Sequence, residues 1–137
     1  MIINLSYIVV TAAILLDRDK ILIARRRKGK HLEFKWEFPG GKVNRDETEE
    51  EALKRELKEE FSIDTLVKNF VAESFYEYDH ISINLRAYLT KIEAGEIQLT
   101  DHDEVAWVNL NELNSFDFAP ADLPIVKSIL SDGIRIN

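Results

Sequence analysis

Three glutamates near the middle of the chain have the side-chain type and spacing to bind a metal ion: Glu56, Glu59 and Glu60. Residues three and four apart share one face of a helix, so these carboxylates would project together. Like charges at this spacing repel by roughly a few tenths of a kcal/mol per pair, which makes the cluster costly unless a cation binds to it. Hard oxygen ligands favour Mg²⁺ or Mn²⁺, and Mg²⁺ commonly joins carboxylates to substrate phosphates. The pattern indicates such a metal site and a phosphate-bearing substrate, although a solvated helix face would carry the same charges.

The helix that must present these glutamates is well marked in the sequence. Thr48 and Glu51 have the form of a capping box, which begins a helix by satisfying its free backbone N–H groups. Leu53 and Leu57 then belong to one narrow apolar stripe on an otherwise charged cylinder. We predict a helix that begins after Thr48 and runs to about Phe61.

The remaining elements are predicted to be mostly strands. The apolar run from Tyr7 to Leu16 is typical of a buried strand, and a second run after a polar turn suggests a hairpin. We expect strands over 7–16, 21–24, 66–78, 81–92 and 105–108, a break at 38–41, a short helix over 109–113 and a final helix over 123–130. Strands that surround two helices favour an α/β fold with a mixed sheet covered on both faces. The 137 residues fit one domain, 1–137.

Composition excludes several classes of protein. A net charge of −7 argues against non-specific nucleic-acid binding, which requires a basic surface. The chain has no cysteine, so it has neither disulfides nor a thiolate zinc site, and a cytoplasmic location is expected. Its apolar opening is shorter than the roughly 20 residues that span a bilayer, so no membrane partner is expected.

The spacing around the acidic helix resembles a family signature. Gly41, five residues, Glu47, seven residues and then Arg55-Glu56-Leu57-Lys58-Glu59-Glu60-Phe61-Ser62-Ile63 is similar to the Nudix box, GX5EX7REUXEEXGU, where U is a bulky aliphatic residue. Ser62 is the one departure, because the family has glycine there. A residue other than glycine in a left-handed helix end costs on the order of 1 kcal/mol, so Ser62 should affect helix termination more than chemistry.

The resemblance implies a fold, a reaction and a metal site. It implies the Nudix fold, an α/β/α sandwich around a mixed sheet, and hydrolysis of a nucleoside diphosphate linked to another group. Trp36 to Lys42 resembles the lead-in of MutT-type nucleoside triphosphate pyrophosphohydrolases. By this resemblance Glu56, Glu59 and Glu60 bind the metal. The backbone carbonyl of Gly40 or Gly41 is a further candidate ligand, because glycine lets the backbone approach an ion closely.

The resemblance also assigns roles around the metal. Arg55 would orient the catalytic carboxylates and Glu47 would support the loop, although both could be purely structural. The base that takes a proton from water would be Glu56 or Asp101, and Glu104 is a substitute for Asp101. Asp101 and Glu104 could equally be loop carboxylates without a catalytic role. Arg26 matches a family position that can contact phosphate.

The nucleotide base is less clearly encoded. Asp122 stands where MutT-type 8-oxo-dGTP hydrolases carry the Asn that contacts the base, and 119–124 is similar to a stretch of CTP pyrophosphohydrolases. An ionised carboxylate only accepts hydrogen bonds, which suits the amino group of cytosine or adenine, whereas a protonated one also donates and would suit oxoguanine. Asp122 could instead cap the last helix. Tyr78 or Phe75 could stack on the base, or belong to the core.

We therefore expect a Mg²⁺-dependent nucleoside triphosphate pyrophosphohydrolase that clears modified or surplus nucleotides, with cytosine nucleotides ahead of 8-oxo-dGTP. Nucleotide sugars and dinucleoside polyphosphates are weaker options. A nucleotide-sensing module without catalysis is the alternative from a different class, and the chain could be a monomer or a homodimer.

Overall fold

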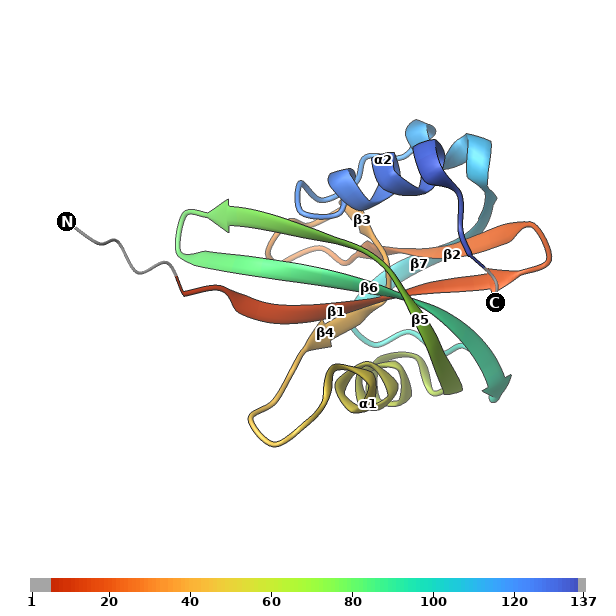
Figure 1. The fold of residues 1–137 in the computed structure, drawn as a ribbon, viewed down its shortest axis with the longest axis horizontal. Helices are drawn as coiled ribbons and strands as arrows, with labels where there is room; N and C mark the ends of the chain where they lie inside the picture. The colour runs from red at the N-terminus through yellow and green to blue at the C-terminus, as the bar shows by residue number, and fades with distance from the viewer. Residues whose placement is uncertain (1–5, 136–137) are drawn as a thin grey trace.

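A computed structural model describes residues 6–135. Two long hairpins and two helices account for most of the ordered structure (Figure 1). In chain order, the elements are β1 (Ile8–Asp17), β2 (Lys20–Arg26), β3 (Trp36–Glu37), β4 (Gly40–Lys42), α1 (Glu49–Phe61), β5 (Asp64–Tyr78), β6 (Ile81–Ala94), β7 (His102–Asn109), the 3₁₀ helix η1 (Leu110–Ser115) and α2 (Leu123–Asp132).

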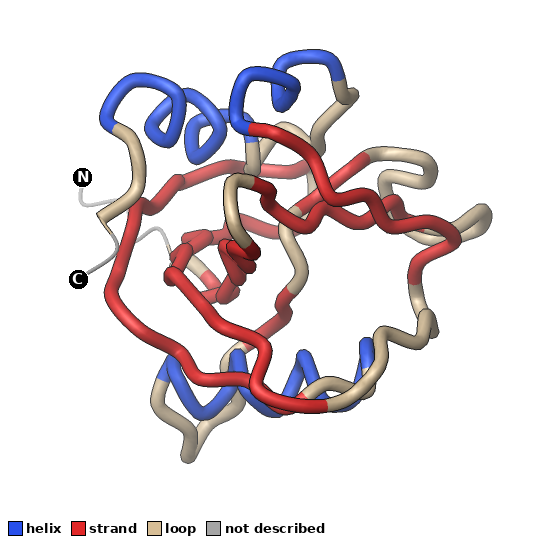
Figure 2. Tube along the Cα trace, turned by 90° about the vertical axis from the view of Figure 1, so that its right-hand side faces the viewer, coloured by secondary structure: helices blue, strands red, loops and turns tan. Residues whose placement is uncertain are grey.

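The strands form one mixed sheet. Its main order is β3-β2-β1-β6-β5, with β4 paired to β1 and β7 paired to β2. β1 and β6 run parallel, and the other pairs are antiparallel. Helix α1 covers one face and α2 the other, which Figures 1 and 2 show from two directions. The predicted α/β/α sandwich is confirmed.

The continuous apolar run of β1 follows from burial on both faces of the sheet. Ala12 and Ile14 belong to the core beneath α2, whereas Ala13 and Leu15 belong to the core beneath α1. Successive side chains of a strand point to opposite faces, so a strand covered on both sides needs apolar residues at every position. The strand predicted over 7–16 is therefore the central strand β1. None of the helices in 6–135 is long and apolar enough to cross a membrane.

Helix α1 begins and ends as the sequence predicted. The Thr48 hydroxyl accepts a hydrogen bond from the Glu51 N–H, and the Glu51 carboxylate accepts one from the Thr48 N–H. Leu53 and Leu57 are fully buried against the sheet. Each such burial contributes about 1.5–3 kcal/mol. The helix is thus fixed in rotation, which determines where its glutamates point.

Ser62 ends this helix in the left-handed conformation, with φ of 60° and ψ of 30°. Its N–H donates to the Lys58 carbonyl, as a helix C-cap commonly does. Glycine adopts this conformation without the steric cost that serine bears.

The variant Ser62→Gly should therefore unfold at a higher temperature than the parent, with a gain of about 1 kcal/mol. Thermal unfolding followed by circular dichroism measures this. Ser128→Gly, inside α2, is the matched control and should be destabilised because glycine weakens a helix interior. Equal destabilisation of both variants would contradict the account of the helix end.

The predicted break at 38–41 is shorter than expected. Only Phe38 and Pro39 are irregular, because Gly40 to Lys42 pair with β1 as strand β4. A Cβ atom on Gly40 would lie 1.9 Å from the Thr11 carbonyl oxygen, so only glycine permits this close pairing. Strand β4 thus ends at Lys42, and the loop over 43–48 leads from it to α1.

Candidate active site

The predicted site residues converge on one cavity of about 480 Å³, a size typical of small-ligand sites. Those that line it are Arg26, Gly41, Glu56, Glu60, Tyr78, Asp101 and Asp122. They come from β2, β4, α1, β5, the loop before β7 and the segment before α2. Folding therefore brings together segments that are far apart in the sequence.

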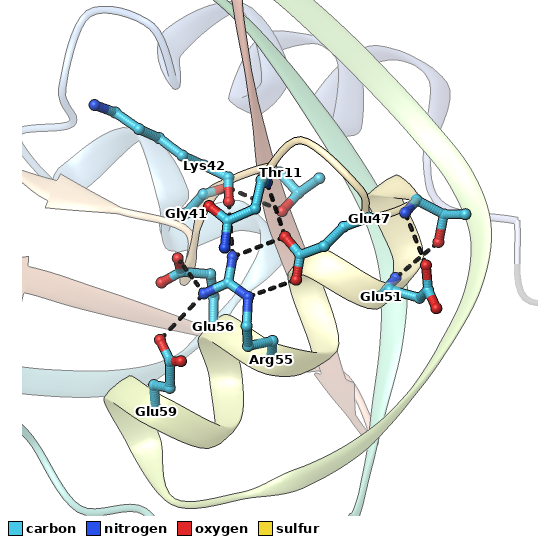
Figure 3. Close-up of polar contacts among 10 residues, drawn as sticks. Thr11, Gly41, Lys42, Glu47, Glu51, Arg55, Glu56 and Glu59 are labelled. Carbon is cyan, nitrogen blue, oxygen red and sulfur yellow. Dashed lines mark hydrogen bonds and ion pairs between the residues drawn. The ribbon is translucent and has the colours of Figure 1, made fainter.

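Arg55 links the acidic helix to the glycine segment (Figure 3). Its Nε lies 2.6 Å from Glu47 Oε2, and its Nη2 donates to the Lys42 carbonyl at 3.0 Å. Its Nη1 contacts Glu56 Oε1 at 3.0 Å and Glu59 Oε2 at 3.1 Å. The hydrogen bond from Arg55 lowers the pKa of Glu47, so this carboxylate stays ionised. In this position Arg55 can orient Glu56 and tie it to the loop.

Glu59 points away from the cavity. Its side chain is 60% exposed, and its described ion pair is with Arg55. Residues 6–135 contain no group of three or more acidic or histidine side chains already arranged to hold a metal ion. Glu59 would have to leave Arg55 to join Glu56 and Glu60.

The Gly41 backbone lies directly against Glu56. A Cβ atom at Gly41 would be 2.3 Å from Glu56 Cδ, so the carboxylate occupies space that a side chain would fill. The Gly41 carbonyl accepts a hydrogen bond from the Thr11 hydroxyl at 3.1 Å, and Gly41 is also the backbone partner of Thr11 in the β1–β4 pair.

Gly41→Ala should fold normally but lose activity by about 100-fold, since small displacements of a catalytic group have effects of that size. The added methyl group meets the carboxylate end of the Glu56 side chain and pushes it aside. Gly40→Ala is the matched control, because its methyl group meets the β1 backbone and should lower stability instead. Unfolding temperature and turnover of both variants test this, and an active, stable Gly41→Ala would contradict it.

Carboxylates beside Glu60 make its ionisation unfavourable. Burial, followed by the nearby charges of Glu56 and Asp101, raises the pKa of Glu60 to about 8. Burial also raises the pKa of Glu56, against the effect of Arg55. At Asp101, burial opposes ionisation, but hydrogen bonds from Lys30 and Glu60 outweigh it and lower the pKa. Hard oxygen donors that repel one another fit a divalent cation, which would offset the repulsion around Glu60.

Asp122 is almost fully buried, with 5% of its surface exposed. Its Oδ2 accepts a hydrogen bond from the Phe38 N–H at 3.0 Å, and it makes no side-chain bond to the start of α2. Asp122 is thus the N-cap residue of α2, but its side chain does not cap the helix. Burial, followed by the charge of Glu37, raises the pKa of Asp122 well above its ordinary value.

Of the two aromatic candidates, only Tyr78 lies at the cavity. Its hydroxyl accepts a hydrogen bond from the Ala121 N–H at 3.2 Å, next to Asp122. Burial raises the pKa of Tyr78. Phe75 is 57% exposed and packs edge-on against Tyr7.

Sequence reasoning did not single out Glu37 and His102, which also line the cavity. Glu37 Oε2 lies 2.7 Å from His102 Nε2, and Glu37 Oε1 lies 3.2 Å from Arg26 Nη1. Arg26, predicted to contact phosphate, thus has a carboxylate partner here. Glu104, the substitute base, pairs with Arg25 at 3.5 Å and does not line the cavity.

Comparison with known proteins decides the family. A family model described as the NUDIX domain matches residues 6–129. The chain belongs to the Nudix hydrolase family. It is 35% identical to the CTP pyrophosphohydrolase of Escherichia coli K12 over 127 residues, covering 93% of this chain and 94% of that protein. It is 34% identical to the 8-oxo-dGTP diphosphatase of the same organism over 113 residues, covering 82% and 88%.

Solved structures agree with the Nudix assignment. The solution structure of the Nudix hydrolase MutT from methicillin-resistant Staphylococcus aureus 252 is 39% identical, with a TM-score of 0.74. The match covers 93% of this chain and 98% of that one. The fold is therefore the Nudix fold. Nudix hydrolases generally use divalent metal ions, and the carboxylates gathered at the cavity have the chemistry to hold one.

Proposed function

We propose that this Nudix hydrolase cleaves nucleoside triphosphates to nucleoside monophosphate and pyrophosphate with Mg²⁺, which Mn²⁺ can replace. The observation that carries the proposal is the cavity, where Glu56, Glu60, Asp101 and the Gly41 carbonyl meet the same space as Asp122. The first set suits a cation and phosphates, and the buried carboxyl group suits a polar base edge. The names of the two curated relatives, a CTP pyrophosphohydrolase and an 8-oxo-dGTP diphosphatase, support this substrate class.

The residues of the cavity divide the work of hydrolysis. Glu56, Glu60 and the Gly41 carbonyl would hold the cation, with Glu59 joining them after release from Arg55. A bound divalent cation supplies charge neutralisation for the phosphates and a lower pKa for a bound water. Glu56 or Asp101 accepts the proton of the attacking water. The raised pKa of Glu56 brings it closer to neutral pH, where a general base is most effective.

Two arginines assist the reaction: Arg55 positions a carboxylate and Arg26 binds the substrate. Arg55 holds Glu56 at 3.0 Å and so keeps the carboxylate directed. Arg26 binds a substrate phosphate through those guanidinium N–H groups that Glu37 and the His31 carbonyl leave free.

The base of the substrate is read by Asp122, with Tyr78 packed beside it. We favour cytosine, whose amino group donates to an ionised Asp122. The raised pKa of Asp122 favours 8-oxo-dGTP as a second candidate, since a protonated carboxyl group both donates and accepts.

A substrate panel tests this proposal. Pyrophosphate release should be measured with CTP, dCTP, 8-oxo-dGTP, dGTP, a nucleotide sugar and a dinucleoside polyphosphate. The triphosphates of cytosine or 8-oxoguanine should give the highest kcat/KM. Binding of these nucleotides without turnover of any of them would instead identify a nucleotide sensor.

A further inference from the structure

Lys30 places a positive charge at the acidic side of the cavity. Its Nζ lies 3.3 Å from Asp101 Oδ1, and both residues line the cavity. The two side chains are 44% and 41% exposed. An ion pair this exposed contributes little to stability, so the contact is not needed to hold the fold together.

The loop that carries Lys30 is held by its backbone. The Phe34 N–H donates to the Arg26 carbonyl at 2.8 Å, and the Lys30 N–H donates to the Arg27 carbonyl at 3.3 Å. Gly29, with φ of 89°, forms the turn just before Lys30. The Lys30 side chain is a flexible four-carbon stem with a compact charge, so its ammonium group can change partners while the loop stays in place.

Asp101 cannot keep this partner during the proposed reaction. If it turns toward a cation held by Glu56 and Glu60, Lys30 loses its carboxylate. The new anions in the same cavity are then the phosphates of the bound nucleotide. Transfer of Lys30 to a phosphate keeps its charge paired, and a charge-assisted hydrogen bond of this kind is among the stronger polar contacts.

We propose that Lys30 is a substrate-binding residue that pairs with Asp101 in the nucleotide-free protein and passes to the polyphosphate chain when a nucleoside triphosphate binds. This inference rests on the proposed function, because it takes the cavity to be the nucleotide site. The 27–35 loop would then take part in nucleotide binding, although it lies outside both the Nudix box and the lead-in motif.

The proposal predicts effects of opposite sign on two ligands. Lys30→Met should weaken binding of the non-hydrolysable probe α,β-methylene-CTP about tenfold, the loss expected for one charge-assisted contact. The same variant should bind Mn²⁺ more tightly without nucleotide, because Lys30 no longer competes for Asp101. Lys30→Arg should keep most of the nucleotide affinity. Titration calorimetry on the full chain measures both ligands without requiring turnover.

Lys28→Met is the matched control. Lys28 is an exposed lysine of the same loop, and within residues 6–135 no carboxylate lies at ion-pair distance from it. The Lys28→Met variant removes the same positive charge and should change the affinity for α,β-methylene-CTP or for Mn²⁺ by no more than about twofold. Unchanged probe affinity in Lys30→Met, or weaker binding of both ligands, would overturn the proposal. If the parent binds the probe through Lys30 but hydrolyses no nucleotide, the proposed function fails and the role of Lys30 stands.

Discussion

Replacing Glu60 with glutamine should remove most nucleotide hydrolysis and at the same time raise the unfolding temperature of the metal-free protein at pH 8. We expect turnover to fall by roughly 100-fold or more. Loss of a group that only supports a metal ligand costs about 10- to 100-fold, and loss of the ligand itself should cost more. Burial and the charges of Glu56 and Asp101 disfavour an ionised Glu60, which is why its pKa is about 8. A neutral amide removes that unfavourable charge but binds a cation poorly.

The sign of the pH dependence follows from the raised pKa of Glu60. Between its ordinary pKa of 4.5 and its folded value of about 8, the folded protein holds a proton that the unfolded chain has released. The contribution of Glu60 to stability is thus fully present below pH 4.5 and is lost as pH rises to about 8. Without metal, the parent should lose stability across this range, and Glu60→Gln should lose less.

Two controls make this result specific. Glu50→Gln changes an exposed glutamate of the same helix and should leave both activity and the pH profile close to those of the parent. Glu59→Gln should lower turnover, since we assign Glu59 to the cation, but should gain little stability because Glu59 is exposed. Parental turnover in Glu60→Gln would contradict the assigned metal site.

Replacing Asp122 with asparagine should shift the ratio of kcat/KM for CTP to that for 8-oxo-dGTP toward 8-oxo-dGTP by about tenfold, the effect of one hydrogen bond. The amide oxygen can still accept the Phe38 N–H bond that now holds the carboxylate, so the fold should be kept. The amide group always donates, whereas Asp122 donates only while protonated.

The parent and Asp122→Asn should therefore differ in their pH profiles. As pH rises, the preference of the parent for CTP should increase because Asp122 ionises, whereas that of the variant should stay level. Asp117→Asn, an exposed aspartate paired with Lys35, is the control. Identical rankings in the parent and in Asp122→Asn at every pH would refute the assignment of Asp122 to the base.

Local signals allowed much of the fold to be predicted from the sequence. The capping box at Thr48, the apolar stripe of α1 and the two-sided burial of β1 depend on neighbouring residues or on periodicity, so they are readable in the chain. The length of the break at 38–41 was overestimated because the pairing of Gly40 with β1 depends on a strand about 30 residues away.

The residues that line the cavity could be predicted where a motif or a resemblance marks them, as for Asp101 and Asp122, but their contacts with one another could not. Glu56, Glu60 and Gly41 follow from the Nudix box, but the pairing of Glu37 with His102 joins residues 65 positions apart. This pairing depends on how β3 and β7 are each aligned with β2, and the alignment of β7 shifts at a bulge between Arg25 and Arg26. No periodic pattern reports such a shift. The hydrogen bond from the Phe38 N–H to Asp122 also joins residues far apart in the sequence, so the sequence did not predict it.

The central claim is that the cavity beside the acidic helix hydrolyses nucleoside triphosphates with a divalent cation. The most direct test is to incubate the parent protein with CTP or 8-oxo-dGTP, with Mg²⁺ or with EDTA, and identify the products by ³¹P NMR. We predict nucleoside monophosphate and pyrophosphate with Mg²⁺ and intact triphosphate with EDTA. Intact triphosphate under both conditions, for both nucleotides, would contradict the claim.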